Sequence, residues 1–344
     1  MLRLVQLRGT VSRCVAVVEE PKLRCLAGVR SIYDLAQQMI ASGETLQGFV
    51  AKAASGDRLA YDAVYAGSSM WHLMPPIDVP EKPAHVLVSG TGLTHLGSAR
   101  ERQAMHKGAS AEAVKSAAAD EAVTDSMRMF SWGVEHGRPT PGKIGVAPEW
   151  FYKGNGRILR AHGEPLAVPE HADDGGEEAE VAAVYLIGPG GKPYRVGLAM
   201  GNEFSDHEYE KKNYLYLAGS KLRTCSLGPE LVIDGEFGNV KGRVRIERAG
   251  KEIWSKNIAT GEENMCHSLE NIEHHHFKFE AHHHPGDVHV HYLGADALSF
   301  GAGVHLENGD VMEVGFEGFG RPLRNPVEVA AKKTSVAYQV QKMT

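Results

Sequence analysis

Cysteine is scarce in this chain of 344 residues, with four thiols at Cys14, Cys25, Cys225 and Cys266. They show no close paired spacing, so the sequence predicts neither a disulfide framework nor a cysteine-based zinc module. A reducing compartment suits such a chain, and we expect the four thiols to be buried.

Long apolar runs and basic clusters are also missing. No stretch approaches the roughly 18 apolar residues that a membrane span requires. The start of the chain, MLRLVQLRGT, lacks the basic and apolar regions of a secretory signal, so we expect a cytoplasmic protein. A formal net charge of -6 without a basic patch argues against nucleic acid or an anionic membrane as partner.

Hydrophobic residues make up 42% of the chain, enough for a substantial globular core. Residues 1–80 combine short β-like runs with one helix-like segment, whose apolar face carries Ile32, Leu35, Met39 and Ile40. The proline-marked connection MPPIDVPEKPA then leads to the remainder of the chain. We therefore predict a small α+β N-terminal domain, residues 1–80, followed by a larger domain over residues 81–344.

The larger domain begins with the apolar run HVLVSGTGLTH, read as a buried strand ending in a glycine loop. This loop lacks the spacing and the lysine of nucleotide-binding loops, so we predict no nucleotide cofactor. An alanine-rich helix follows from residue 110 and ends at Gly137. Short β-rich runs then alternate with glycine turns, and LIGPGGKPYR predicts a hairpin. The fold class is therefore α+β, predominantly β.

Acidic residues flank this hairpin. Glu178 and Glu180 lie two apart at the start of its first strand, so both side chains point to one face. Glu203 follows Asn202 at the end of the second strand, with Asp206 close behind. The hairpin would bring the three glutamates together as oxygen ligands for a hard cation such as magnesium, manganese or calcium. The alternative is a solvated acidic turn.

Six motifs occur in a characteristic order: PEWFYKGNG, EEAEVA, GNEFSDHE, GSKLRTCSLGPELV, HHHPGDVHVHYLG and LENGDVMEVGFEGFGRPLRNPV. Together they resemble the fumarylacetoacetate hydrolase superfamily over about residues 85–330. The stretch SGTGLTHLGSARERQAMH is similar to its sugar-acid branch, which includes 2-keto-3-deoxy-pentonate dehydratases. The resemblance implies a mixed β-sandwich roll as the catalytic domain, and a homodimer.

The resemblance also assigns roles to individual residues. It implies Mg²⁺ or Mn²⁺ as cofactor, held by Glu178, Glu180 and Glu203, with Lys221 as the active-site lysine ahead of a Gly-Pro pair. The third acid is Asp in many relatives, so Glu203 is a departure. Lys153, Thr94 and Ser205 are the substrate-binding candidates, although Lys153 could also be a plain surface lysine.

Such a site would bind a small 2-keto acid and acidify its C3 proton. Loss of a C4 hydroxyl then gives dehydration, whereas attack of water on a C4 ketone breaks the C3–C4 bond. Hydrolytic relatives carry a His-x-x-Glu unit, but here His95 is followed by Ser98, and the next glutamate is Glu101. This favours a dehydratase, with His95 or Glu101 at the departing hydroxyl. The alternatives are a C–C hydrolase of a 2,4-diketo acid and a catalytically silent sugar-acid binder.

The densest histidine run, IEHHHFKFEAHHHPGDVHVHY, does not show metal-ligand spacing with acid or cysteine support. In DVHVHY the alternation places His289 and His291 on one face, as in a half-exposed strand. We expect these histidines to lie on loops and strand faces, with a zinc site as the minority alternative.

Overall fold

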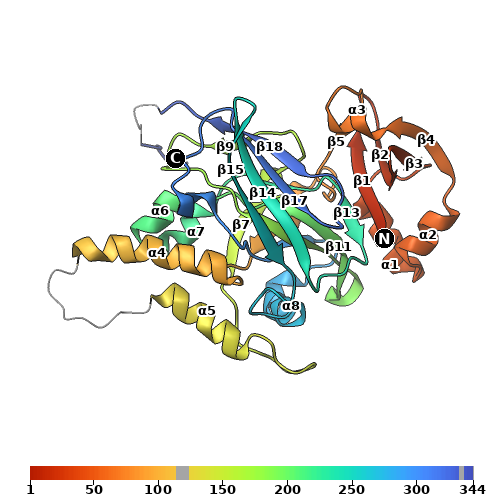
Figure 1. Ribbon diagram of the computed structural model, residues 1–344. Helices are drawn as coiled ribbons and strands as arrows, with labels where there is room; N and C mark the ends of the chain where they lie inside the picture. Colours follow the sequence, from red (N-terminus) through yellow and green to blue (C-terminus); the bar gives the residue numbers. More distant parts are fainter. Residues whose placement is uncertain (114–123, 333–336, 344) are drawn as a thin grey trace.

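The computed structural model describes residues 1–113, 124–332 and 337–343. Two β-sheets form the centre of this chain, with helices at the edges and ends (Figure 1). The predicted α+β, predominantly β class is confirmed.

The larger sheet has 13 strands within the described residues. Its main path runs in the order β4 (Ser55–Ala60), β3 (Lys22–Leu26), β2 (Arg13–Glu19), β1 (Leu2–Arg8), β13 (Leu231–Ile233), β11 (Pro193–Asn202), β10 (Ala179–Ile187), β16 (Val288–Tyr292), β6 (Val86–Gly90) and β7 (Phe151–Asn155). Off this path lie β5 (His72–Leu73), β8 (Leu159–Arg160) and β12 (Cys225–Leu227).

The N-terminal strands belong to this same sheet, because β1 pairs antiparallel with β13. The expected helical segment is two helices, α1 (Ile32–Ser42) and α2 (Leu46–Lys52), and α3 (Tyr61–Tyr65) follows. Gly43 ends α1 with a φ of 73°, a left-handed conformation that glycine adopts without strain. A separate N-terminal domain at residues 1–80 stays a prediction.

The second sheet has the order β15 (Lys251–Thr260), β14 (Val240–Arg248), β17 (Val311–Phe316), β18 (Leu323–Val329) and β9 (Leu166–Val168). It lies over the strands β10 and β11, as Figure 1 shows. One hydrophobic core joins the sheets, where Val181 and Met200 of the hairpin meet Val244 and Val314. This is the sandwich that the motifs predicted.

Strand β10 is buried along its whole length. Its odd-numbered residues, such as Val181, face the second sheet, whereas Ala182 and Val184 contribute to a core shared with Leu35 of α1. Successive side chains of a strand point to opposite faces, so β10 lies between two layers. Its residues therefore have little freedom to move.

The remaining helices of the described chain are α4 (Leu96–Ala113), α5 (Asp125–His136), α6 (His207–Lys212), α7 (Leu217–Ser220) and α8 (Leu269–Phe277). The predicted helix end at Gly137 is confirmed, because Gly137 is the C-cap of α5. Its predicted start at residue 110 is wrong, since α4 already begins at Leu96. Residues 114–123 of that prediction lie outside the described residues.

The prediction of a half-exposed strand at His289 and His291 is also wrong. Strand β16 is fully buried, because it runs between β10 and β6. His291 stays hydrogen-bonded there, with Nδ1 beside Ser89 Oγ at 2.9 Å and Nε2 beside Thr91 Oγ1 at 2.7 Å. Alternation of polar and apolar residues can thus arise in a central strand whose polar side chains find partners on a neighbouring strand.

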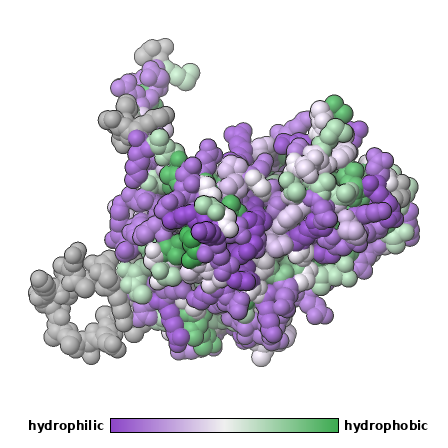
Figure 2. Space-filling view, turned by 45° about the horizontal axis from the view of Figure 1, so that its top comes forward, coloured by the Kyte–Doolittle hydropathy of each residue, from purple (hydrophilic) through white to green (hydrophobic). Residues whose placement is uncertain are grey.

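The face drawn in Figure 2 gives little information about binding partners. The face in Figure 2 is mostly hydrophilic and carries small, separate hydrophobic areas. Within the described residues, no helix combines the length and apolar character needed to cross a membrane. The homodimer stays a prediction.

Buried histidines make stability depend on pH. Burial lowers the pKa of His162 to about 4, below the ordinary value of 6.5. Protonation between these values favours the unfolded chain, so this contribution is full above pH 6.5 and is lost as the pH falls toward 4. We expect His162→Gln to reduce the slope of unfolding free energy against pH by about 1 kcal/mol per pH unit around pH 5.

Urea unfolding at several pH values between 4.5 and about 7.5 measures this slope. The exposed His136 provides the matched control, and His136→Gln should leave the slope as in the wild type. An unchanged slope in His162→Gln would show that His162 is not a neutral buried group.

Candidate active site

The antiparallel hairpin of β10 and β11 brings the acidic residues together. Ala179 pairs with Asn202 and Glu180 with Gly201, so the start of one strand lies beside the end of the other. The Glu203 amide donates to the Glu178 carbonyl at 2.9 Å, and the Asn202 side chain accepts from the Glu178 amide at 3.1 Å. These bonds fix the backbone on which the carboxylates stand.

One carboxylate oxygen from each of Glu178, Glu180 and Glu203 lies within 4.8 Å of the others. All three side chains are buried, so the alternative of a solvated acidic turn does not hold. Burial, and then the charges of Glu178 and Glu203, raise the pKa of Glu180 well above its usual range. Among the described residues Glu180 has no ion-pair partner, and its Oε2 accepts only the Gly294 amide, at 2.6 Å.

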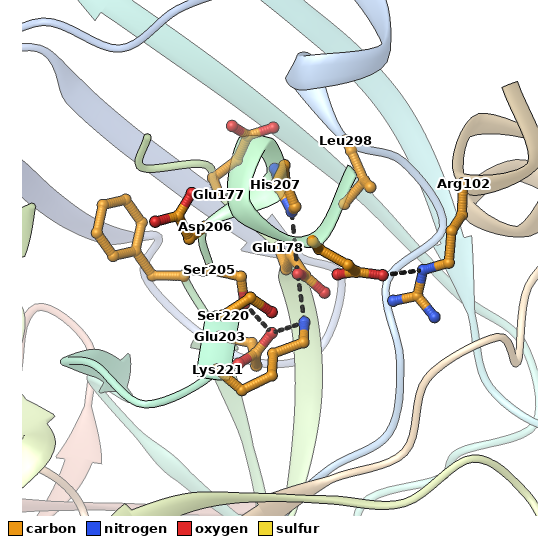
Figure 3. A network of polar contacts seen from close by, with 12 residues as sticks. Arg102, Glu177, Glu178, Glu203, Ser205, Asp206, His207, Ser220, Lys221 and Leu298 are labelled. Carbon is orange, nitrogen blue, oxygen red and sulfur yellow. Dashed lines mark hydrogen bonds and ion pairs between the residues drawn. The ribbon is translucent and has the colours of Figure 1, made fainter. Parts of the chain in front are cut away.

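Lys221 bridges the other two acids (Figure 3). Its Nζ lies 2.5 Å from Glu178 Oε1 and 2.5 Å from Glu203 Oε2, and 4.7 Å from the centre of the Phe151 ring. Although burial opposes it, the charges of these two carboxylates raise the pKa of Lys221. Lys221 is therefore an ammonium at neutral pH.

Lys153 of β7 is not a surface residue but is buried beneath the site. Its Nζ lies 2.5 Å from Glu203 Oε1 and donates to the carbonyls of Phe204 at 2.8 Å and Lys221 at 2.9 Å. The two carbonyls use two of the three donors of an ammonium, and the third contact is an ion pair. Lys153 thus ties Glu203 to the backbone of Lys221, and Ser205 adds a hydroxyl that donates to Glu203 Oε2 at 2.8 Å.

His207 lies in the site, although no sequence motif selected it as a candidate. Its Nε2 donates to Glu178 Oε1 at 3.0 Å, as Figure 3 shows, and its buried Nδ1 has no hydrogen-bond partner among the described residues. Burial alone would lower the pKa of His207, yet the hydrogen bond and charge of Glu178 raise it. A Cβ at Gly176 would lie 2.2 Å from Nδ1, so only glycine allows this ring position.

Two neighbouring acids have other partners. Asp206 forms an ion pair with Arg223 at 2.9 Å and caps α6 by accepting from the Tyr209 amide at 2.9 Å. Glu177 accepts from the amide of Ser299 at 2.6 Å and from its hydroxyl. Burial raises the pKa of Glu177 to about 7, and the bonds to Ser299 offset part of this effect. Both acids therefore help to fix the backbone segments around the site.

Within the described residues, no hydrogen bond or ion pair joins His95 or Glu101 to the three acids. His95 is buried, and because the Thr94 hydroxyl donates to the Leu293 carbonyl, His95 Nδ1 donates to Thr94 Oγ1 at 2.8 Å. His95 Nε2 lies 3.1 Å from Thr260 Oγ1, and burial lowers the pKa of His95 to about 4. Glu101 pairs with Lys256 at 3.1 Å.

The three carboxylates suit a divalent cation. Lys221 and Lys153 contact Glu178 and Glu203, which leaves Glu180 as a buried acid that no cation neutralises within the described chain. Oxygen-only ligands select a hard ion, so Mg²⁺ and Mn²⁺ both fit this donor set. Lys221 and the ion would compete for the oxygens of Glu178 and Glu203.

Comparison with known proteins bears on the fold. No protein-family model matches the sequence, and no curated protein matches it. Solved structures do match over nearly the whole chain. A 2-keto-3-deoxy-D-arabinonate dehydratase complexed with magnesium and 2,5-dioxopentanoate shares 18% sequence identity, with a TM-score of 0.68 over 95% of this chain and 99% of that one.

Two further structures have different activities. A 5-carboxymethyl-2-hydroxymuconate delta-isomerase from Mycobacterium smegmatis has 15% identity and a TM-score of 0.57, over 95% of this chain and all of its own. A fumarylacetoacetate hydrolase from psychrophilic Exiguobacterium antarcticum has 16% identity and a TM-score of 0.60, over 96% of this chain and all of its own. The predicted fumarylacetoacetate hydrolase fold is confirmed, and its neighbours include a dehydratase, an isomerase and a hydrolase.

Replacing Glu180 by glutamine tests the cation site. Without a divalent ion, we expect Glu180→Gln to be at least as heat-stable as the wild type, because a neutral amide replaces an acid whose ionisation is disfavoured by burial and by two neighbouring carboxylates. Magnesium at 100-fold over its Kd should stabilise the wild type by about 2.7 kcal/mol and leave Glu180→Gln almost unchanged.

Thermal unfolding with EDTA and with magnesium checks both halves of this expectation. Glu236→Gln changes an exposed acid outside the site and should respond to magnesium like the wild type. Equal stabilisation of Glu180→Gln would mean that magnesium binds elsewhere.

Proposed function

We propose that this protein is a divalent-cation-dependent dehydratase of a 2-keto-3-deoxy sugar acid, most simply a pentonate. The observation that carries the proposal is the buried group of Glu178, Glu180 and Glu203 with Lys221 bridging two of them. The fold is shared with a dehydratase whose structure holds magnesium and 2,5-dioxopentanoate.

That compound has the composition of a 2-keto-3-deoxy-pentonate less one water. A proton leaves C3, the hydroxyl leaves C4 as water, and tautomerisation turns the C5 carbinol into an aldehyde. When bound by the three glutamates, a divalent cation would supply positive charge at the carboxylate and keto oxygens of the substrate. The protein's own groups must then position the substrate and move the protons.

Lys221 is the residue we place at the reacting atoms. Its ammonium is held among the carboxylates by two contacts of 2.5 Å, so it can stabilise negative charge growing on the keto oxygen or transfer a proton. Lys153 is buried against Glu203 and two backbone carbonyls, so we infer that it positions Glu203 and Lys221 rather than reacting itself. Ser205, through Glu203, supports the same arrangement.

Two residues, His95 and Glu101, are candidates for assisting the departure of the C4 hydroxyl. Thr94 lies beside His95. Since His95 is neutral and both its nitrogens are hydrogen-bonded, it needs a rearrangement to reach the substrate. Full turnover by His95→Ala would remove it from the scheme. Ser98 at the position of the hydrolytic glutamate donates to the His95 carbonyl at 3.3 Å, so no local dyad activates water. This favours elimination over C–C hydrolysis.

Metal-dependent turnover tests the proposal directly. We expect EDTA-treated protein to regain activity on a 2-keto-3-deoxy-pentonate when magnesium is added, with 2,5-dioxopentanoate as the product seen by mass spectrometry. Lys221→Met should lower kcat by about 100-fold or more, because a positioned proton donor contributes on that order.

Lys241→Met replaces an exposed lysine and serves as the matched control, with kcat unchanged. Cleavage of a 2,4-diketo acid to pyruvate, without dehydration of either pentonate epimer, would make the protein a C–C hydrolase. Tight binding of a keto acid without turnover under any metal would instead indicate a silent sugar-acid binder.

A further inference from the structure

Three of the histidines in the densest run come together from different elements. His276 is on α8, His282 ends the 3-10 helix η5 (Glu280–His282), and His289 is on β16. All three are buried, and one ring nitrogen from each lies within 4.8 Å of the others. Sequence spacing did not reveal this group, since it forms only where α8 and η5 meet the sheet.

The rings have the separation that a shared ion requires. Their centres lie 4.7 Å apart for His276 and His282, 5.0 Å for His276 and His289, and 5.2 Å for His282 and His289. Three imidazoles around a tetrahedral ion have centres roughly 5 Å apart, because the metal–nitrogen bond is about 2.0–2.1 Å and the ring centre lies about 1.1 Å beyond the nitrogen.

The protonation states of the histidines suit metal binding. Burial lowers the pKa of His289 to about 3, and it lowers that of His276 further, so both are neutral ligands near pH 7. His282 Nδ1 lies 2.5 Å from the carbonyl oxygen of His276 and must donate to it. The lone pair of a neutral His282 is therefore on Nε2, which has no hydrogen-bond partner among the described residues.

We propose that His276, His282 and His289 bind a borderline divalent cation of the zinc type, with water at a fourth position. Three imidazoles without a carboxylate or other oxygen ligand select Zn²⁺, Co²⁺ or Ni²⁺ over Mg²⁺. His291 is not a ligand, because both its nitrogens bond to Ser89 and Thr91.

This site is separate from the carboxylates, although β10 runs past both. Tyr185 of β10 pairs with His289, whereas Glu180 is five residues earlier on the same strand. At about 3.3 Å per residue the two sites are roughly 16 Å apart. An ion at the histidines would fasten α8 and η5 to the sheet, so we assign it a structural role that is independent of the proposed dehydratase chemistry.

Trp150 competes with metal binding. Its indole N–H donates to His276 Nδ1 at 3.2 Å, which places the proton of neutral His276 on Nε2, where it points at His289 Nδ1 at 2.8 Å. Binding through Nε2 moves this proton to Nδ1 and breaks the bond to Trp150. We therefore expect the ion to change the Trp150 environment, and Trp150→Phe to bind it more tightly than the wild type.

Cobalt titration of the tag-free protein in excess magnesium tests the proposal. We expect one equivalent of Co²⁺ to give the visible absorption of a four-coordinate ion, and zinc to displace it. His282→Ala should weaken binding at least 100-fold while keeping magnesium-dependent turnover. His289→Gln, checked for folding by circular dichroism, should do the same. His274→Ala changes an exposed neighbour on α8 and should bind cobalt as the wild type does.

A second histidine group provides the decisive contrast. His85, His284 and Asp287 also have ligand atoms within 4.8 Å of one another, but they lie at the surface. Loss of the cobalt signal in His284→Ala with retention in His282→Ala would place the ion there and overturn the proposal. Wild-type affinity in His282→Ala would overturn it as well.

Discussion

Neutralising buried negative charge is the constraint on which this structure depends. Three buried carboxylates meet at one end of the β10–β11 hairpin. Leaving an ionised carboxylate buried and unpaired costs several kcal/mol, so the surrounding chain must supply cations. Lys221, at the end of α7, pairs with Glu178 and Glu203. Lys153 of β7 pairs with Glu203 as well. Glu180 remains without a cationic partner among the described residues, and a bound divalent cation would neutralise it.

Much of the active-site geometry was predictable because it is local. The turn in LIGPGGKPYR indicates a hairpin, and the period of two along β10 places Glu178 and Glu180 on one face. By contrast, His207 reaches Glu178 only because the chain turns into α6 shortly after β11. The ring also needs the space that glycine leaves at position 176. Lys153 was a candidate for substrate binding that could not be told from a plain surface lysine, since nothing local shows that α7 packs against β7.

The histidine-rich segment shows where periodicity stops being informative. Alternating histidine and valine describes a half-exposed strand and a central strand equally well. Which of them forms depends on the neighbours, and here Ser89 and Thr91 of the β6 region supply the hydrogen bonds that let His291 be buried. Likewise, His276 and His289 meet only after α8 packs against the sheet. Non-local pairing of this kind cannot be read from spacing along one segment.

The most direct test of the account is a crystal soaked in Mn²⁺, with anomalous diffraction locating the ion. We expect a manganese ion bonded to Glu178, Glu180 and Glu203, with Lys221 displaced from at least one of its carboxylates. No anomalous signal at these residues, with Lys221 still bridging Glu178 and Glu203, would contradict it. The three acids would then be a lysine-neutralised structural cluster rather than a metal centre.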